Sequence, residues 1–124
     1  MIFIIGGAYQ GKTDFAREAF ALTDADIYTC TGEEPDFSHR CIDNLENFTL
    51  ACTQKGTDPM DYFRAHRAEW ENCIFICRDM FCGVVPLDAQ TRAWRQDTGR
   101  LTQYLSREAE RVSRIFCGLE QRLK

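Results

Sequence analysis

The first thirteen residues combine three features in a fixed order. Residues 1–5 form a short apolar run, and residues 6–13 then read Gly-Gly-Ala-Tyr-Gln-Gly-Lys-Thr. This segment fits G-x-x-x-x-G-K-[ST], the phosphate-binding loop (P-loop), which needs a buried strand before it and a helix after it. Its glycines let the backbone curl until successive N–H groups point inward at an anion, and the following helix directs its positive dipole end to the same place. The segment therefore predicts nucleoside triphosphate binding; the alternative is a helix capped by a glycine turn.

Each position of the loop has an expected role. We predict that the triphosphate is held by Gly6, Gly7, Ala8, Tyr9, Gln10, Gly11, Lys12 and Thr13. Lys12 is expected to neutralise charge on the β- and γ-phosphates, as a catalytic residue, and the Thr13 hydroxyl to bind Mg²⁺. Either ATP or GTP would serve as the substrate.

A P-loop also needs an acidic partner that follows a buried strand. Asp79 follows the apolar run Ile74–Cys77, so the end of that strand should lie near Thr13. We therefore predict Asp79 as a metal ligand and catalytic carboxylate, with an ordinary loop acid as the alternative.

Length and charge exclude several classes of protein. We expect residues 1–124 to form a single P-loop nucleotide-binding domain, because this length supports one core. The formal net charge of −4 argues against nucleic acid as the main partner. No apolar stretch approaches the length of a membrane span, and the first apolar run is too short for a signal peptide.

The seven cysteines form no Cys-x-x-Cys pair. We predict free thiols that pack as small hydrophobic residues, which indicates a reducing, cytoplasmic environment. Zinc is not expected, because His39 and His66 lie far from any paired cysteines.

Strands and helices are expected to alternate along the chain. Apolar runs predict strands at 1–5, 27–30, 73–77 and 114–117. Apolar residues at helical spacing predict helices at 14–22, 42–54, 59–70 and 89–112, with a tail at 118–124. This alternation predicts an α/β fold, a P-loop NTPase-like three-layer sandwich around a mainly parallel central sheet.

Four segments resemble the motifs of one family. The loop at 6–13 is similar to Gly-Gly-Ala-x-x-Gly-Lys-[Ser/Thr], and residues 78–86 resemble [Asn/Asp]-Glu-[Val/Ile]-Gly-x-Gly-[Ile/Val]-Val-Pro. Residues 92–103 resemble Arg-x-aromatic-Arg-[Asp/Glu]-x-x-Gly-Arg-x-[Asn/Gln], and residues 116–124 resemble Val-x-Gly-[Ile/Leu]-Pro-x-x-[Leu/Ile]-Lys. In this order the motifs resemble the adenosylcobinamide kinase/adenosylcobinamide-phosphate guanylyltransferase family of cobalamin assembly.

The chain also departs from this family pattern. Asp79 is shorter than the family glutamate, Arg78 replaces a neutral or acidic residue, and Phe81 replaces a glycine. A central strand ending in an Asp-Cys-Leu-Thr-like segment is expected to have no counterpart. The guanylyl-accepting histidine of the family lies in His-x-x-x-Arg-Pro-x-x-Trp, which His39 and His66 each match only in part. Guanylyl transfer is therefore a minor alternative, with His39 the better candidate.

The resemblance implies a kinase that uses Mg²⁺ and a nucleoside triphosphate to phosphorylate a corrinoid side-chain hydroxyl, and it implies a homo-oligomer. Three other functions stay open: a nucleotide-binding protein with reduced catalysis, a small-molecule kinase with another acceptor, and a structural domain with a vacant loop. Arg92 and Arg95 share a helical face and could meet phosphate, a neighbouring subunit or water.

Overall fold

The computed structural model describes residues 1–80 and 88–124. Its strands are β1 (Ile2–Gly6), β2 (Ile27–Thr29), β3 (Cys41–Asp43), β4 (Ile74–Arg78), β5 (Arg111–Phe116) and β6 (Leu119–Arg122). Its helices are α1 (Lys12–Phe20), the 3-10 helix η1 (Asp24–Asp26), α2 (Leu45–Lys55), α3 (Pro59–Ala65), α4 (Arg67–Trp70) and α5 (Ala89–Glu108). Most of the predicted motif at 78–86, from Phe81 to Pro86, lies outside the described residues. None of the helices in the two described ranges is long and apolar enough to cross a membrane.

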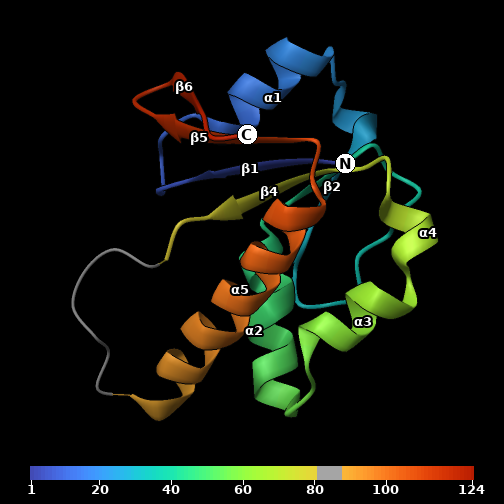
Figure 1. Ribbon diagram of the computed structural model, residues 1–124, viewed down its shortest axis with the longest axis vertical. Helices are drawn as coiled ribbons and strands as arrows, with labels where there is room; N and C mark the ends of the chain where they lie inside the picture. The colour runs from blue at the N-terminus through green and yellow to red at the C-terminus, as the bar shows by residue number, and fades with distance from the viewer. Residues whose placement is uncertain (81–87) are drawn as a thin grey trace.

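The strands form one sheet with β1 near its centre (Figure 1). The strand order is β2-β3-β4-β1-β5-β6, in which β1 to β5 run parallel and β6 pairs antiparallel with β5. Gly6, the last residue of β1, lies opposite Arg78 on β4 and Ile115 on β5. The predicted mainly parallel sheet is confirmed, and the carboxyl ends of these strands lie at one edge, where ligands bind in such sheets.

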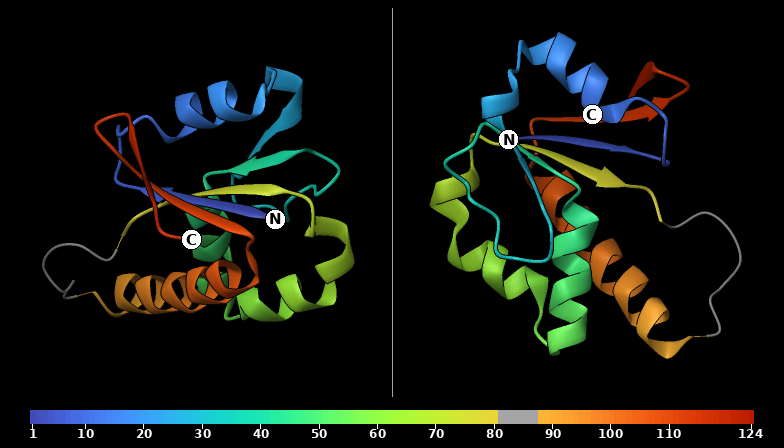
Figure 2. Two further views of the ribbon diagram at one scale, coloured as in Figure 1. Left: turned by 45° about the horizontal axis from the view of Figure 1, so that its top comes forward. Right: turned by 180° about the vertical axis from the view of Figure 1, so that it is seen from behind.

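Helices cover both faces of the sheet, which gives the predicted three layers (Figure 2). Helix α1 and η1 lie on one face, and α2 to α5 lie on the other. Ile4 of β1 belongs to one core with Ala16 of α1, whereas its neighbour Phe3 belongs to the other core with Leu101 of α5. The continuous apolar run of β1 thus fits a strand whose alternate side chains are buried on opposite faces.

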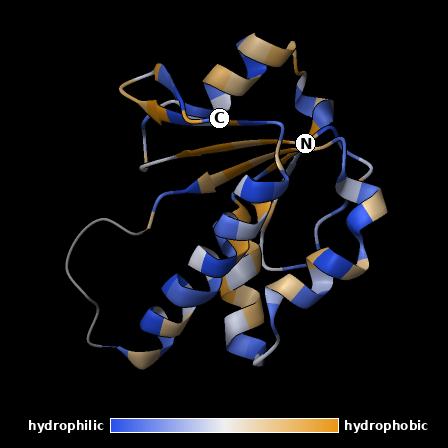
Figure 3. Cartoon of the chain, viewed as in Figure 1, coloured by the Kyte–Doolittle hydropathy of each residue, from blue (hydrophilic) through white to orange (hydrophobic). Residues whose placement is uncertain are grey.

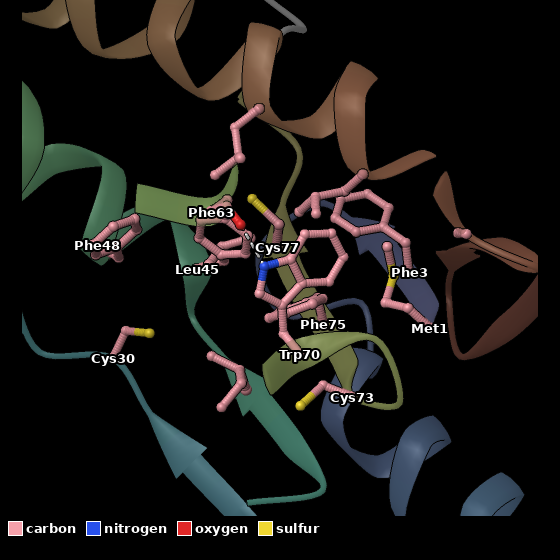
Figure 4. Close-up of a cluster of buried hydrophobic side chains, with 14 of the residues drawn as sticks. Met1, Phe3, Cys30, Leu45, Phe48, Phe63, Trp70, Cys73, Phe75 and Cys77 are labelled. Carbon is pink, nitrogen blue, oxygen red and sulfur yellow. Dashed lines mark hydrogen bonds between the residues drawn. The ribbon is translucent and has the colours of Figure 1, made fainter. Parts of the chain in front are cut away.

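The larger core is rich in aromatic side chains (Figure 4). Trp70 is completely buried, and its Nε1 donates a hydrogen bond to the Phe63 carbonyl oxygen at 2.7 Å. The Phe63 ring lies 5.4 Å from the Phe75 ring, centroid to centroid. Figure 3 shows the same division along the chain, with apolar central strands and a largely polar α5. The helices therefore pack through their apolar stripes and leave polar faces outward.

The prediction of a helix at 42–54 is wrong in its first turn. Ile42 keeps the helical spacing of α2, but it lies in β3, paired with Tyr28 on β2 and Phe75 on β4. The sheet prevails because a central strand satisfies its backbone hydrogen bonds on both sides while it buries its side chains.

The predicted helix at 59–70 is two helices, α3 and α4, which meet at His66. Asp58 caps α3 as expected, because its side chain accepts a hydrogen bond from the Met60 N–H at 2.9 Å. At His66 the backbone leaves the helical region (φ −107°, ψ 20°). This break redirects the chain and places Trp70 in the core.

The C-terminal part of the chain also differs from its prediction. The predicted helix at 89–112 ends at Glu108, and Val112 lies in β5. The predicted tail contains β6, which forms a hairpin with β5. Cys117 and Gly118 connect the two strands with φ values of 51° and 74°, and two positive φ values are typical of a type I′ hairpin turn.

Candidate functional site

The loop between β1 and α1 has the backbone that a phosphate-binding loop requires. A Cβ atom on Gly6 would lie 2.6 Å from the main-chain oxygen of Ile115, so no side chain fits there. Gly11 caps α1 with φ 90°, a conformation that glycine adopts without strain. Tyr9 also has a positive φ of 60°, and its side chain is fully exposed. The loop therefore turns sharply and directs the first N–H groups of α1 outward at the edge of the sheet.

Lys12 lies over its own loop. Its Nζ donates a hydrogen bond to the Gly7 carbonyl oxygen at 2.7 Å. The ammonium group is thus within the curl of the loop, where the role predicted for Lys12 requires a positive charge.

The Thr13 hydroxyl meets a carboxylate from another strand. Thr13 Oγ1 donates a hydrogen bond to Asp43 Oδ2 at 2.8 Å. Asp43 ends β3 and is only 7% exposed, and its Oδ1 accepts the Asn44 N–H at 2.7 Å. Both residues line a hollow of about 380 Å³ beside the loop, together with Tyr9, Gly11, Lys12, Asp14 and Asn44. A hydroxyl and a carboxylate are the oxygen ligands that suit Mg²⁺, which usually takes one or two carboxylates and keeps water or phosphate for its other positions.

Asp79 lies on the other flank of the loop. Its N–H donates to the Gly6 carbonyl oxygen at 2.7 Å, which joins the end of β4 to the end of β1. Asp79 lines a second hollow, of about 350 Å³, with the loop residue Ala8 and with Arg78 and Arg95. Asp79 is therefore next to the P-loop, as expected, but the carboxylate that contacts Thr13 is Asp43. The roles of Asp79 as catalytic carboxylate and metal ligand stay predictions.

A buried polar network holds the two flanks together. Glu46 in α2 is 8% exposed, and its Oε1 accepts the Arg78 N–H at 3.0 Å. Trp94 in α5 donates from Nε1 to the Glu46 carbonyl oxygen at 2.9 Å and to Thr49 Oγ1 at 3.1 Å. The start of α2, the end of β4 and the first half of α5 are thus fixed to one another, because buried polar groups of this kind are costly to separate.

The thiols near this network have raised pKa values. Burial, with smaller contributions from Glu46 and Asp43, raises the pKa of Cys30 to about 12. Burial also raises the pKa of Cys77, and Glu46 and Asp79 add to this effect while Lys12 opposes it. Five of the six described cysteines are buried and all six are free. The prediction of free thiols in the core is confirmed for these five; Cys117 is exposed, and Cys82 lies outside the described residues.

The two histidines lie away from the P-loop. His39 precedes β3, and the neighbouring Arg40 carbonyl oxygen accepts the N–H of Ile74, the first residue of β4. His39 is therefore at the amino edge of the sheet, opposite to the edge that carries the P-loop. His66 pairs with Glu69 through Nδ1, and its ring lies 4.3 Å from the Tyr62 ring, centroid to centroid. These contacts fit a structural role for His66.

Asp43 and Glu46 were not predicted from the sequence. The signal for Asp43 is the same one that predicted Asp79, an apolar strand that ends in an acid, but β3 has only three residues. So short a run is easily read as the first turn of the following helix. Glu46 has no comparable signal, because a glutamate in the first turn of a helix is usually a solvent-exposed residue that favours the helix dipole.

Comparison with known proteins identifies a family. No curated protein matches the chain. The chain matches the family model described as cobinamide kinase/cobinamide phosphate guanyltransferase over residues 41–123. The match covers more than half of the 124 residues and includes Asp43 and Asp79, whereas the P-loop precedes it. The family found by this match is the one that the motifs at both ends of the sequence resemble, and the chain belongs to this cobinamide kinase/cobinamide phosphate guanyltransferase family.

Proposed function

We propose that the protein is a nucleoside-triphosphate-dependent kinase that phosphorylates a corrinoid side-chain hydroxyl. The observation that carries this proposal is the 2.8 Å contact between Thr13 Oγ1 and Asp43 Oδ2 beside the P-loop. A P-loop hydroxyl and an acid at a strand end are the pair that holds Mg²⁺ in P-loop enzymes. The family description supplies the acceptor class, cobinamide.

Different residues are proposed to have different roles in phosphoryl transfer. The loop N–H groups and Lys12 bind and orient the triphosphate, and Thr13 with Asp43 would hold Mg²⁺. Bound Mg²⁺ would neutralise charge on the β- and γ-phosphates. The acceptor hydroxyl oxygen forms a bond to the γ-phosphorus while the bond from the γ-phosphorus to the β-phosphate oxygen breaks. Positioning of the reactants and stabilisation of charge supply most of the catalysis.

We propose that the second flank of the loop acts on the acceptor hydroxyl. Asp79 and Arg95 share a hollow with Ala8 of the loop. We assign Asp79 the role of catalytic carboxylate, which would accept the proton of the acceptor hydroxyl. The guanylyltransferase half of the family name is not included in the proposal, because His39 lies at the amino edge of the sheet and His66 packs against Tyr62.

A single assay tests the proposal. The protein is incubated with Mg²⁺, ATP or GTP, and adenosylcobinamide, and the corrinoid is analysed by mass spectrometry. We expect a corrinoid heavier by one phosphoryl group, and we expect Lys12→Ala to lower its rate of formation by about 100-fold or more. Lys124→Ala is the matched control, because Lys124 instead binds the carbonyl oxygens of Ser106 and Arg107.

The outcome also separates the alternatives. Tight nucleotide binding without phosphorylation of any corrinoid would contradict the kinase proposal and favour a nucleotide-binding protein with reduced catalysis. If adenosylcobinamide is not phosphorylated but another hydroxylated metabolite supplied in its place is, the protein is a kinase with another acceptor.

A further inference from the structure

The turn of the β5–β6 hairpin is attached to the P-loop. The Gly118 N–H donates to the Gln10 carbonyl oxygen at 2.8 Å, and the Cys117 N–H donates to Gln10 Oε1 at 2.6 Å. A Cβ atom added to Gly11 would lie 3.5 Å from the Gly118 Cα atom, so the turn passes close to the P-loop backbone. In Figure 1 this turn and the loop after β1 lie at the same end of the sheet. The hairpin turn is therefore fixed directly beside the P-loop.

The hairpin carries exposed apolar side chains next to its turn. Phe116 and Leu119 lie opposite each other in the β5–β6 ladder, and their residues are 59% and 73% exposed. Directly paired residues of two strands project on the same face of the sheet, so these two side chains form a single apolar surface beside the turn. We call Phe116 and Leu119 the hairpin platform. Adjacent apolar side chains left exposed at a ligand site are typical of a binding surface.

The position of the Thr13–Asp43 pair indicates which part of a nucleotide reaches this platform. Asp43 belongs to β3, on one side of β1, whereas the hairpin extends the sheet on the other side. Thr13 and Asp43 would hold Mg²⁺, which would neutralise charge on the β- and γ-phosphates, so we place the γ-phosphate end of a triphosphate on the β3 side. The nucleoside must then leave the loop toward β5 and its hairpin.

We propose that the hairpin platform binds the base of the nucleoside triphosphate. This inference rests on the proposed function, because it requires a triphosphate in the P-loop. The base would place its π-face against the Phe116 ring and the Leu119 side chain. The guanidinium of Arg114 lies 5.8 Å from the centroid of the Phe116 ring and restrains that ring from one side. Stacking of this kind accepts any base, because every base has a π-face.

Calorimetric titration with three magnesium-loaded probes tests the platform: ATP, GTP and inorganic tripolyphosphate. We expect Phe116→Ala to weaken the affinity for both nucleotides about tenfold, as loss of a base–aromatic contact does. Leu119→Ala should weaken both affinities less, and Phe116→Trp should preserve them. Tripolyphosphate has no base, so its affinity should be the same in all variants. Leu123→Ala is the matched control, because Leu123 is similarly exposed (56%) but follows β6 at the end away from the turn.

Each outcome bears on one of the two proposals. Unchanged nucleotide affinity in Phe116→Ala and Leu119→Ala would overturn the platform and leave the P-loop assignment intact. Equal losses for nucleotides and tripolyphosphate would also overturn it, since the hairpin would then only support the loop. If the unmodified protein binds neither the nucleotides nor tripolyphosphate, the proposed function itself is wrong.

Discussion

At the scale of single residues, the contact between Thr13 and Asp43 indicates which carboxylate is placed to bind Mg²⁺. The general rule places an acid at the end of a buried strand near the P-loop, and both Asp43 and Asp79 satisfy it. The main-chain N–H of Asp79 extends the β1–β4 contact to Gly6, whereas the Asp43 side chain reaches across to the Thr13 hydroxyl. The two acids therefore differ in how they reach the loop: Asp43 contacts the Thr13 hydroxyl through its side chain, and Asp79 contacts Gly6 through its main-chain N–H.

Substitution of the two acids gives a direct prediction. Asp43→Asn keeps the shape of the side chain but removes the negative charge, so we expect the enhancement of ATP binding by Mg²⁺ to be lost and phosphorylation to fall about 100-fold or more. Asp79→Asn should retain that enhancement and lose only phosphorylation. Titration of ATP binding with and without Mg²⁺ measures the difference. If Asp79→Asn removes the effect of Mg²⁺ while Asp43→Asn does not, the metal ligand is Asp79, as the sequence alone predicted.

At the scale of elements, the sequence was informative where several signals agreed. β1 is an apolar run, the P-loop is a glycine motif and α1 has an apolar stripe, and these three signals follow one another directly. β4 begins with four consecutive apolar residues. β3 and β6 lack such agreement: Ile42 fits a helix and a strand equally well, and no residue of β6 is buried. Their place depends on pairing with distant strands, which a local pattern does not encode. The contact between Thr13 and Asp43 depended on β3 and was missed for the same reason.

The β5–β6 hairpin gives a prediction about acid stability. Hydrogen bonds from Arg111 and from Ser113 Oγ, the latter 2.6 Å from Glu120 Oε1, lower the pKa of Glu120 below its ordinary 4.5. A carboxyl group with a lowered folded-state pKa stabilises the protein above its unfolded-state pKa, and this contribution is lost as the pH falls through the folded-state value. We expect Glu120→Gln to reduce the free energy of unfolding by about 1 kcal/mol at pH 7. The difference should shrink once the pH falls below 4.5.

Urea unfolding of both proteins at several pH values measures this difference. Glu18→Gln, which changes an exposed glutamate of α1, should have little effect at any pH. A difference for Glu120→Gln that stays constant down to pH 2 would contradict the ionic role of Glu120.

At the scale of the whole molecule, buried cysteines lie in the cores on both faces of the sheet. Cys41 lies in the core beneath α1, and Cys77 lies in the core beneath α2 and α5. Burial raises the pKa of Cys41 to about 12 and raises that of Cys77 as well. Because both cores share the same central strands, we expect the two layers to unfold together, as one domain.

Thiol labelling during urea unfolding tests this cooperativity. The thiolate attacks iodoacetamide and displaces iodide, so alkylation needs an exposed, ionised thiol. At pH 8 an exposed thiol such as Cys117 should react in the folded protein, whereas Cys41 and Cys77 should become reactive only at one common urea midpoint. Above pH 9, the ordinary thiol value, the unfolded chain ionises first while the folded thiols stay protonated. Each buried thiol should then lower the free energy of unfolding by on the order of 1 kcal/mol per pH unit. The common urea midpoint should therefore be lower at pH 10 than at pH 8. Peptide mapping by mass spectrometry reads each cysteine separately. Reaction of Cys41 at clearly lower urea than Cys77 would show that the α1 layer opens alone, which a single cooperative domain does not do.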